Sequence, residues 1–175
     1  MTCNTLHFFT LTMIIFFSTI IVSYSADARP HFSRFCVKAI DKPFCSKVVH
    51  GTKTWKDAMK KAVKTTYRHA KRAKPLVENL IAKLPSTVPP AAKYSICDTC
   101  KDSYNSVIRE LHASIAVVKN GRLNLMLSAA YTDLEDCSRA FLDFNVPTKN
   151  QLFKSNEVTA KLISTCLAVE KANPK

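Results

Sequence analysis

The sequence has very little glycine and no pattern typical of β-strands. Only Gly51 and Gly121 occur among its 175 residues, and no segment alternates apolar with polar side chains. No internal repeat is present either. Segments that lack glycine and carry apolar residues at every third or fourth position are typical of helices. The sequence therefore predicts an all-α protein.

Residues that could perform chemistry are also scarce. No histidine beyond residue 28 stands at a recognisable spacing from a serine or cysteine nucleophile. The 13 acidic residues are scattered, which disfavours a paired-carboxylate hydrolase. The single Cys97-Asp-Thr-Cys100 motif lacks two zinc ligands, and no strand precedes it as in redox proteins. We expect no catalytic residue, no metal and no cofactor.

The amino terminus lacks charge. No Lys, Arg, Asp or Glu precedes Asp27, and the apolar run from Leu11 to Val22 is too short to span a bilayer of about 30 Å. Small residues follow and allow cleavage before Ala26 or Arg29. We interpret residues 1–28 as a secretory signal peptide, with a retained membrane anchor as the alternative. Residues 29–175 are then long enough for one domain with its own core.

Positive charge is in excess. The 26 lysines and arginines outnumber the acidic residues, and the net charge of +13 falls entirely beyond residue 26. Such an excess favours an acidic partner, for example anionic pectin, or else only keeps the surface solvated. No nucleic-acid-binding motif is present, so we expect no nucleic acid partner, and no membrane contact after signal removal.

Four amphipathic segments are predicted to form helices. The first follows the N-cap Thr54 and ends near Leu84, with a kink or break at Pro75. The others cover about 91–119, 123–144 and 150 or 155–171; Asn120-Gly121 and Asn145-Val-Pro147 end the second and third. With short connections, four helices pack most simply as an up-down-up-down bundle. Ahead of them, the spacing of Cys36 and Cys45 around Pro43 suits a helical hairpin or turn.

The apolar periodicity also predicts which side chains face inward and which face outward. The inward set is Trp55, Ala58, Met59, Ala62, Val63, Ala70, Ala73, Val77, Leu80, Ile81, Leu84, Ile96, Cys97, Cys100, Tyr104, Val107, Ile108, Leu111, Ile115, Val118, Leu123, Met126, Leu127, Ala130, Leu134, Cys137, Phe141, Leu152, Val158, Leu162, Ile163, Cys166 and Val169. The outward face of the first helix carries Lys60, Lys61, Lys64, Arg68, His69, Lys71, Arg72 and Lys74. Such a face binds anionic pectin or a membrane surface, or else it is merely solvated.

The order and spacing of several residues resemble the plant invertase and pectin methylesterase inhibitor family. The matching pattern is Cys-x8-Cys, Cys-x3-Tyr-x6-Leu, Leu-Ser-Ala-Ala and Cys-x3-Phe. These motifs are Cys36 with Cys45, Cys100 with Tyr104 and Leu111, Leu127-Ser128-Ala129-Ala130, and Cys137 with Phe141. The resemblance extends from about Phe32 to Ala172.

This resemblance implies a disulfide framework that spacing alone cannot assign. It implies a four-helix bundle preceded by an N-terminal helical hairpin, with disulfides Cys36–Cys45 and Cys100–Cys137. Cys3 leaves with the signal peptide, so Cys97 and Cys166 remain. Buried free thiols are the simpler interpretation, because cysteine packs as a small hydrophobe, and a third disulfide is the alternative.

The resemblance also implies an inhibitor secreted into the plant apoplast and cell wall. Invertase inhibitors carry Pro-Lys-Phe after the glycine that ends the second helix, whereas this chain has Gly121-Arg-Leu-Asn. The Leu127-Ser-Ala-Ala-Tyr-Thr-Asp133 stretch is more similar to pectin methylesterase inhibitors. We therefore interpret the protein as an inhibitor that blocks the pectin cleft of a plant pectin methylesterase in a reversible equimolar complex.

Six polar residues are the expected contacts with that enzyme. They are Lys101, Asp102, Asn105 and Arg109 on the second helix, and Asp133 and Asp136 on the third. One alternative is the same scaffold inhibiting a cell-wall or vacuolar acid invertase. Another is a basic wall-binding or antimicrobial helical protein with no enzyme target.

Overall fold

The computed structural model describes residues 32–116, 122–146 and 151–173, apart from the side chains of Leu80, Gln151 and Leu152. The chain divides at His31 into two units, and these residues belong to the second. The predicted signal peptide and its cleavage sites lie outside the described residues. Within the described ranges, no helix is long and apolar enough to cross a membrane.

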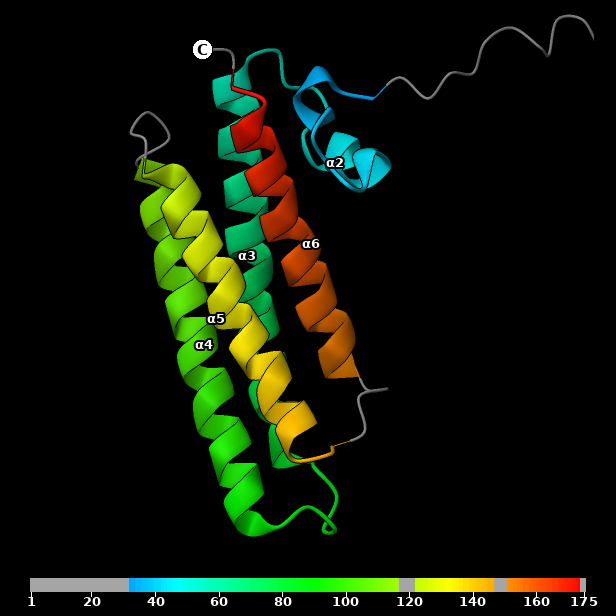
Figure 1. Ribbon diagram of the computed structural model, residues 1–175, viewed down its shortest axis with the longest axis vertical. Coiled ribbons are helices and arrows are strands. Elements are labelled where there is room, and N and C mark those ends of the chain that lie inside the picture. Colours follow the sequence, from blue (N-terminus) through cyan, green and yellow to red (C-terminus); the bar gives the residue numbers. More distant parts are fainter. Residues whose placement is uncertain (1–31, 117–121, 147–150, 174–175) are drawn as a thin grey trace, which may run out of the picture. The chain divides into compact units, whose positions relative to one another are not determined.

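Helices account for most of the described chain (Figure 1). A 3-10 helix η1 (Arg34–Cys36) and a short helix α2 (Lys42–Val48) come first. Four long helices follow: α3 (Trp55–Ala82), α4 (Pro90–Ala116), α5 (Leu123–Asp143) and α6 (Gln151–Lys171). No strand occurs among the described residues, and the predicted all-α class is confirmed.

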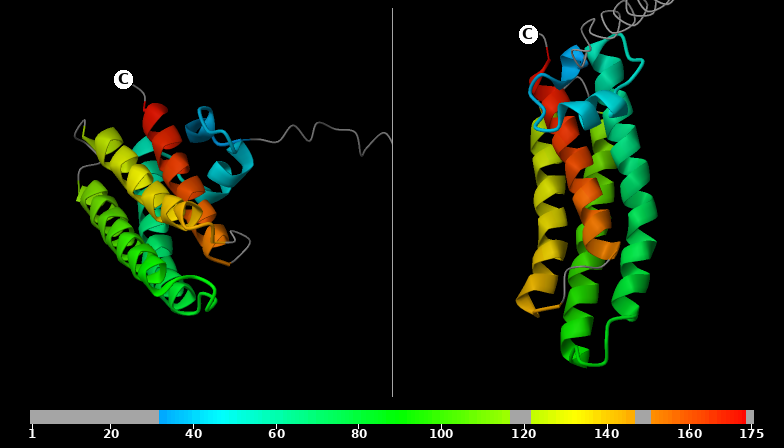
Figure 2. Two further views of the ribbon diagram at one scale, coloured as in Figure 1. Left: turned by 60° about the horizontal axis from the view of Figure 1, so that its bottom comes forward. Right: turned by 90° about the vertical axis from the view of Figure 1, so that its right-hand side faces the viewer.

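The four long helices form the predicted up-down-up-down bundle. Helix α3 packs against α4, α4 against α5, α5 against α6, and α6 back against α3. Consecutive helices run in opposite directions, as both figures show (Figures 1 and 2). The N-terminal hairpin of η1 and α2 contacts α6 and α3. Each long helix therefore buries an apolar face against two neighbours and leaves the opposite face exposed.

Helix α3 begins at its predicted cap and is not broken at Pro75. The Thr54 hydroxyl accepts a hydrogen bond from the Asp57 amide at 3.1 Å and donates to the Asp57 carboxylate at 2.6 Å. Of the predicted kink or break, the break is wrong, because a single helix continues through Pro75. Proline removes one hydrogen bond, but Ala73 and Val77 on either side are buried at 1% exposure. Tertiary packing on both sides therefore outweighs the local preference.

Helix α5 ends in a Schellman motif at the predicted position. Asn145 adopts a positive φ of 52°, and its amide donates to the Leu142 carbonyl at 3.0 Å. The Val146 amide donates to the Phe141 carbonyl at 3.0 Å, and the Val146 side chain is buried with Phe141. Asparagine tolerates this left-handed conformation better than most residues. The other predicted stop, Asn120-Gly121, lies outside the described residues, as do Pro147 and Val118.

The core follows the predicted apolar faces with a few corrections. Met59, Ile96, Leu111, Leu127 and Ile163 are fully buried, one or more from each long helix. Side chains of Leu80 and Leu152, both predicted to face inward, are not described.

Several side chains differ from the predicted pattern. Four residues of the predicted inward set are only half-buried, namely Trp55, Ile108, Ile115 and Met126. Val158 is 37% exposed, because Thr159 and Asn156 occupy the buried positions on that turn of α6. Cys97 is only half-buried. His69, predicted to lie on the outward basic face, is half-buried. Burial lowers the pKa of His69, Arg72 lowers it further, and a hydrogen bond with the Ser155 backbone opposes both effects.

Two disulfides connect neighbouring elements. Cys36 in η1 is bonded to Cys45 in α2, and Cys100 in α4 is bonded to Cys137 in α5. Cys97 and Cys166 are unbonded. The buried Cys166 thiol lies 3.2 Å from the Thr66 hydroxyl, and burial raises the pKa of that thiol to about 12.

A buried polar network connects three helices beside the Cys100–Cys137 bond. The Tyr104 hydroxyl donates to the Asn156 side-chain oxygen at 2.6 Å, and both residues are buried. The Asn156 amide group donates to the Ser138 hydroxyl at 3.1 Å. Burial raises the pKa of Tyr104, which therefore stays protonated and keeps its donor. The network fixes α4, α5 and α6 against one another.

Replacing Tyr104 by phenylalanine is expected to lower the free energy of unfolding by about 1 to 2 kcal/mol. The substitution leaves the buried Asn156 oxygen without its donor while preserving the ring. Urea unfolding followed by circular dichroism measures the change. Tyr94→Phe is the matched control, because Tyr94 is 75% exposed and should change stability very little. Equal stability of both variants would contradict a role for the network.

Candidate protein-binding surface

The six predicted contact residues lie on the outer side of the α4–α5 pair, which we call the docking face. Lys101, Asn105 and Arg109 follow one another at every fourth position of α4, so they form a row about 12 Å long. All four α4 residues of the set are exposed. On α5, Asp136 is exposed and Asp133 is half-buried, three residues apart on neighbouring turns.

Electrostatic interactions connect the two helices near Arg109. The Arg109 guanidinium lies 3.6 Å from the Glu110 carboxylate and donates to the Ser106 hydroxyl at 3.0 Å. Partial burial raises the pKa of Asp133, and the negative charges of Glu110 and Asp136 raise it further, whereas Arg109 lowers it. Arg109 therefore interacts with Glu110 on its own helix and with Asp133 on α5.

The disulfide sets the level at which the two halves of the docking face meet. Because Cys100 is bonded to Cys137 in an antiparallel pair, Lys101 and Asp136 come at the same level of the bundle. Among the described residues, no hydrogen bond or ion pair joins Lys101, Asp102 or Asn105 to α5. Their polar groups remain available to a partner.

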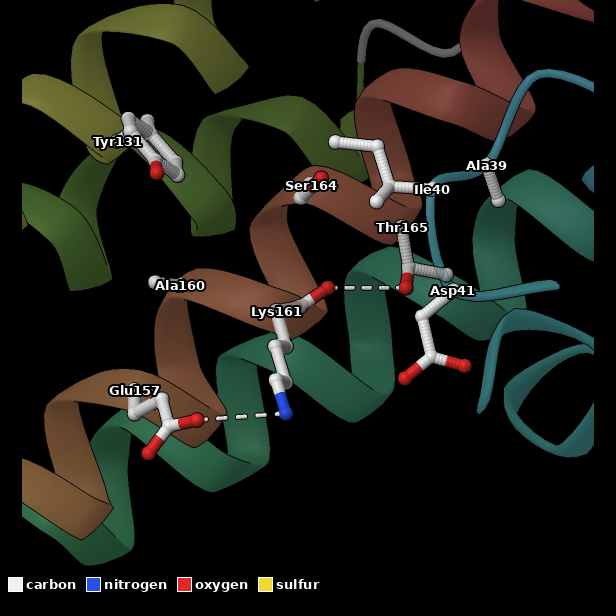
Figure 3. A pocket seen from close by; sticks show the side chains of 9 residues that line it. All are labelled: Ala39, Ile40, Asp41, Tyr131, Glu157, Ala160, Lys161, Ser164 and Thr165. Carbon is white, nitrogen blue, oxygen red and sulfur yellow. Dashed lines mark hydrogen bonds and ion pairs between the residues drawn. The ribbon is translucent and has the colours of Figure 1, made fainter. Parts of the chain in front are cut away.

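A second candidate surface is a hollow of about 300 Å³ between the N-terminal hairpin and α6, which we call the hairpin groove (Figure 3). Figure 3 shows Tyr131 of α5 on one side and Ile40 on the other, with Ala160 and Ser164 of α6 between them. Ile40 is 96% exposed, an unusual position for a large apolar side chain.

Several polar groups of the hairpin groove already have partners within the protein. Lys161 lies 3.3 Å from Glu157, and the Thr165 hydroxyl donates to the Lys161 carbonyl at 2.9 Å. The Asp41 carboxylate accepts from the Phe44 amide and caps α2. The groove therefore offers small and apolar side chains for packing rather than groups for catalysis.

Sequence reasoning missed Glu110 and the hairpin groove. Glu110 adjoins Arg109 in the chain, and its charge could have been included with the predicted contacts. The sequence did offer one sign of the groove, because Ile40 is an apolar residue that lies outside every periodic segment. How the hairpin contacts α6 depends on tertiary packing, so the hollow itself could not be inferred.

Catalytic and metal-binding arrangements are missing from the described part of the chain. No group of three or more His, Cys, Asp or Glu side chains there could hold a metal ion. His112 is exposed with its ring 5.7 Å from that of Tyr67, and His50 lies on the surface of the hairpin. His31 lies outside the described residues.

Comparison with known proteins identifies the family. A comparison with curated proteins gave no match. Among solved structures, the fold is similar to the crystal structure of a pectin methylesterase inhibitor from Arabidopsis thaliana, with a TM-score of 0.56 and 17% sequence identity. That similarity covers 85% of this chain and 99% of the other. Residues 31–169 match the plant invertase/pectin methylesterase inhibitor family. Since this match covers most of the sequence, the chain belongs to the plant invertase/pectin methylesterase inhibitor family.

Proposed function

We propose that the protein is a secreted inhibitor of a plant pectin methylesterase that acts by covering the enzyme's pectin cleft. The family consists of inhibitors of pectin methylesterase or invertase rather than enzymes. The observation that carries the choice of target is the Leu127-Ser-Ala-Ala-Tyr-Thr-Asp133 stretch, together with Gly121-Arg-Leu-Asn where invertase inhibitors have Pro-Lys-Phe. Its destination is then the apoplast, because residues 1–28 have the composition of a signal peptide.

The proposed mechanism is steric exclusion of substrate. Disulfide Cys100–Cys137 and the Tyr104 network hold α4 and α5 in one arrangement, so little conformational entropy is lost when the docking face binds. Arg109 supplies a charged anchor, and Lys101, Asp102 and Asn105 supply hydrogen-bonding groups. Pectin methyl esters would then persist for as long as the complex does.

The target is tested by titration against two purified enzymes. We expect the mature protein to inhibit plant pectin methylesterase at mildly acidic pH and to co-elute with it in gel filtration. An acid invertase assayed in parallel for sucrose hydrolysis should remain active. Inhibition of the invertase alone would assign the alternative target. Inhibition of neither enzyme, with no complex on gel filtration, would overturn the proposal.

The docking face is tested by charge reversal at Arg109. Arg109→Glu should weaken inhibition at least about tenfold, because it replaces a positive charge of the docking face by a negative one near Glu110 and Asp133. Lys154→Glu on the exposed side of α6 makes the same change of charge and should leave inhibition unaltered.

A third variant distinguishes the docking face from the hairpin groove. Ile40→Asp places a charge at the rim of that groove without touching α4. If Ile40→Asp weakens inhibition and Arg109→Glu does not, the enzyme binds at the hairpin groove instead. Dissociation constants for all three variants, measured by inhibition titration, decide between the two surfaces.

A further inference from the structure

The exposed side of α3 carries a shallow hollow lined by residues of that helix alone. Its volume is about 280 Å³. The lining residues, which we call the basic groove, are Asp57, Lys60, Lys61, Lys64, Thr65 and Arg68. Four of these six carry positive charge. The groove therefore concentrates cations on a helix that contributes none of the docking-face residues.

The cations follow a regular row. Lys56, Lys60, Lys64, Arg68 and Arg72 occupy every fourth position of α3 and are all exposed. At 1.5 Å per residue, the row extends for about 24 Å along the helix. Positions four apart advance by about 40° around the axis, so the three central side chains share one side.

Within the described residues, no ion pair neutralises the central cations of this row, and the one acidic residue that lines the hollow, Asp57, is hydrogen-bonded to Thr54. Among the described residues, Lys60, Lys64 and Arg68 form no ion pair or hydrogen bond. Lys61 is engaged, because its ammonium group donates to the His50 carbonyl. Like charges four residues apart destabilise a helix. Because this row of like charges destabilises α3, its presence is better explained by binding of an anionic ligand than by a contribution to the stability of the fold.

We propose that the basic groove binds a linear polyuronate, a polysaccharide with a carboxylate on each sugar. A row of cations at regular intervals complements a polymer whose negative charges recur along its length. The Thr65 hydroxyl and the Asp57 carboxylate line the same hollow and can form hydrogen bonds with sugar hydroxyls.

The lining favours this ligand over the other polyanions. No apolar side chain lines the groove, whereas helices that lie on membranes insert an apolar face beside their cations. No aromatic side chain lines it either, so nucleobases would find no stacking platform. A carboxylated polysaccharide needs neither feature.

The inference is tested without any enzyme, so its outcome is independent of the proposed inhibition. Binding of the mature protein to polygalacturonate is measured by isothermal titration at low salt. The triple variant Lys60→Glu/Lys64→Glu/Arg68→Glu should bind polygalacturonate at least about tenfold more weakly than the wild type. Added salt should weaken the binding of the wild type by a similar factor. Fully methyl-esterified pectin, which lacks the charges, should not bind.

A matched triple variant separates the groove from net charge. Arg122→Glu/Arg139→Glu/Lys154→Glu changes the net charge by the same amount at exposed positions on other elements. It should retain most of the affinity. Equal losses in both triple variants would overturn the proposal, and so would tighter binding to anionic lipid vesicles or single-stranded DNA. Circular dichroism confirms that each variant is folded.

Discussion

Replacing Cys100 and Cys137 together by alanine is expected to lower the free energy of unfolding by roughly 4 kcal/mol. The bond closes a loop between residues 37 apart in sequence, and the chain-entropy model assigns about this value to a loop of that length. For a domain of this size, such a loss corresponds to a melting temperature lower by about 8 to 16 °C. Thermal unfolding followed by circular dichroism measures it.

The second disulfide supplies the comparison. Cys36 and Cys45 are only 9 residues apart, so their joint replacement by alanine should cost roughly 2.5 kcal/mol. Because η1 and α2 contact the bundle at one end, part of that loss should appear as local unfolding of the hairpin rather than of the whole bundle. Unchanged melting of the Cys100/Cys137 variant, or a larger loss at the shorter loop, would contradict the loop-entropy account.

Raising the pH from 9 toward 12 is expected to destabilise the protein through Cys166, by up to about 4 kcal/mol. Burial raises the pKa of this thiol from the ordinary 9.0 to about 12 in the folded state. The unfolded thiol therefore loses its proton first, and the unfolded state gains stability as the pH rises. The contribution of Cys166 is fully present below pH 9 and is lost as the pH approaches 12.

A single substitution isolates this contribution. Cys166→Ala removes the titrating group, so its free energy of unfolding should fall less steeply between pH 9 and 12 than that of the wild type. Tyr104, whose pKa is also raised, titrates in both proteins and cancels in the comparison. Cys97→Ala, which removes the other unbonded thiol, is the matched control. Parallel curves for Cys166→Ala and the wild type would disprove the assignment.

The sequence predicted the helices better than it predicted how their polar residues pair. Thr54 and Asn145 mark helix ends through local backbone chemistry, so their roles were visible in the chain itself. Thr66 and Asn156 are polar yet buried, and each finds its partner on another helix. Periodicity records which positions are apolar, but it cannot show that a polar side chain meets a partner across the bundle.

The candidate surfaces could likewise be predicted only in part from the sequence. Exposure of Lys101, Asp102, Asn105 and Arg109 followed from the helical repeat, because all four lie opposite the apolar face of α4. The surroundings of Asp133 could not be inferred from the helical repeat, because the charges that raise the pKa of its carboxyl group come partly from α4. Interactions between distant segments require the packed structure.

The arrangement of helices around the bundle has one consequence for an inhibitor in a cell wall. The basic groove is lined by α3 alone, whereas the docking face belongs to α4 and α5. If both proposals hold, the molecule can be tethered to pectin while it captures an enzyme working on the same polymer. Pectin methylesterase creates the carboxylates that would recruit the inhibitor, so its own product would raise the local concentration of its antagonist. De-esterification would then limit itself in the places where it had already gone furthest.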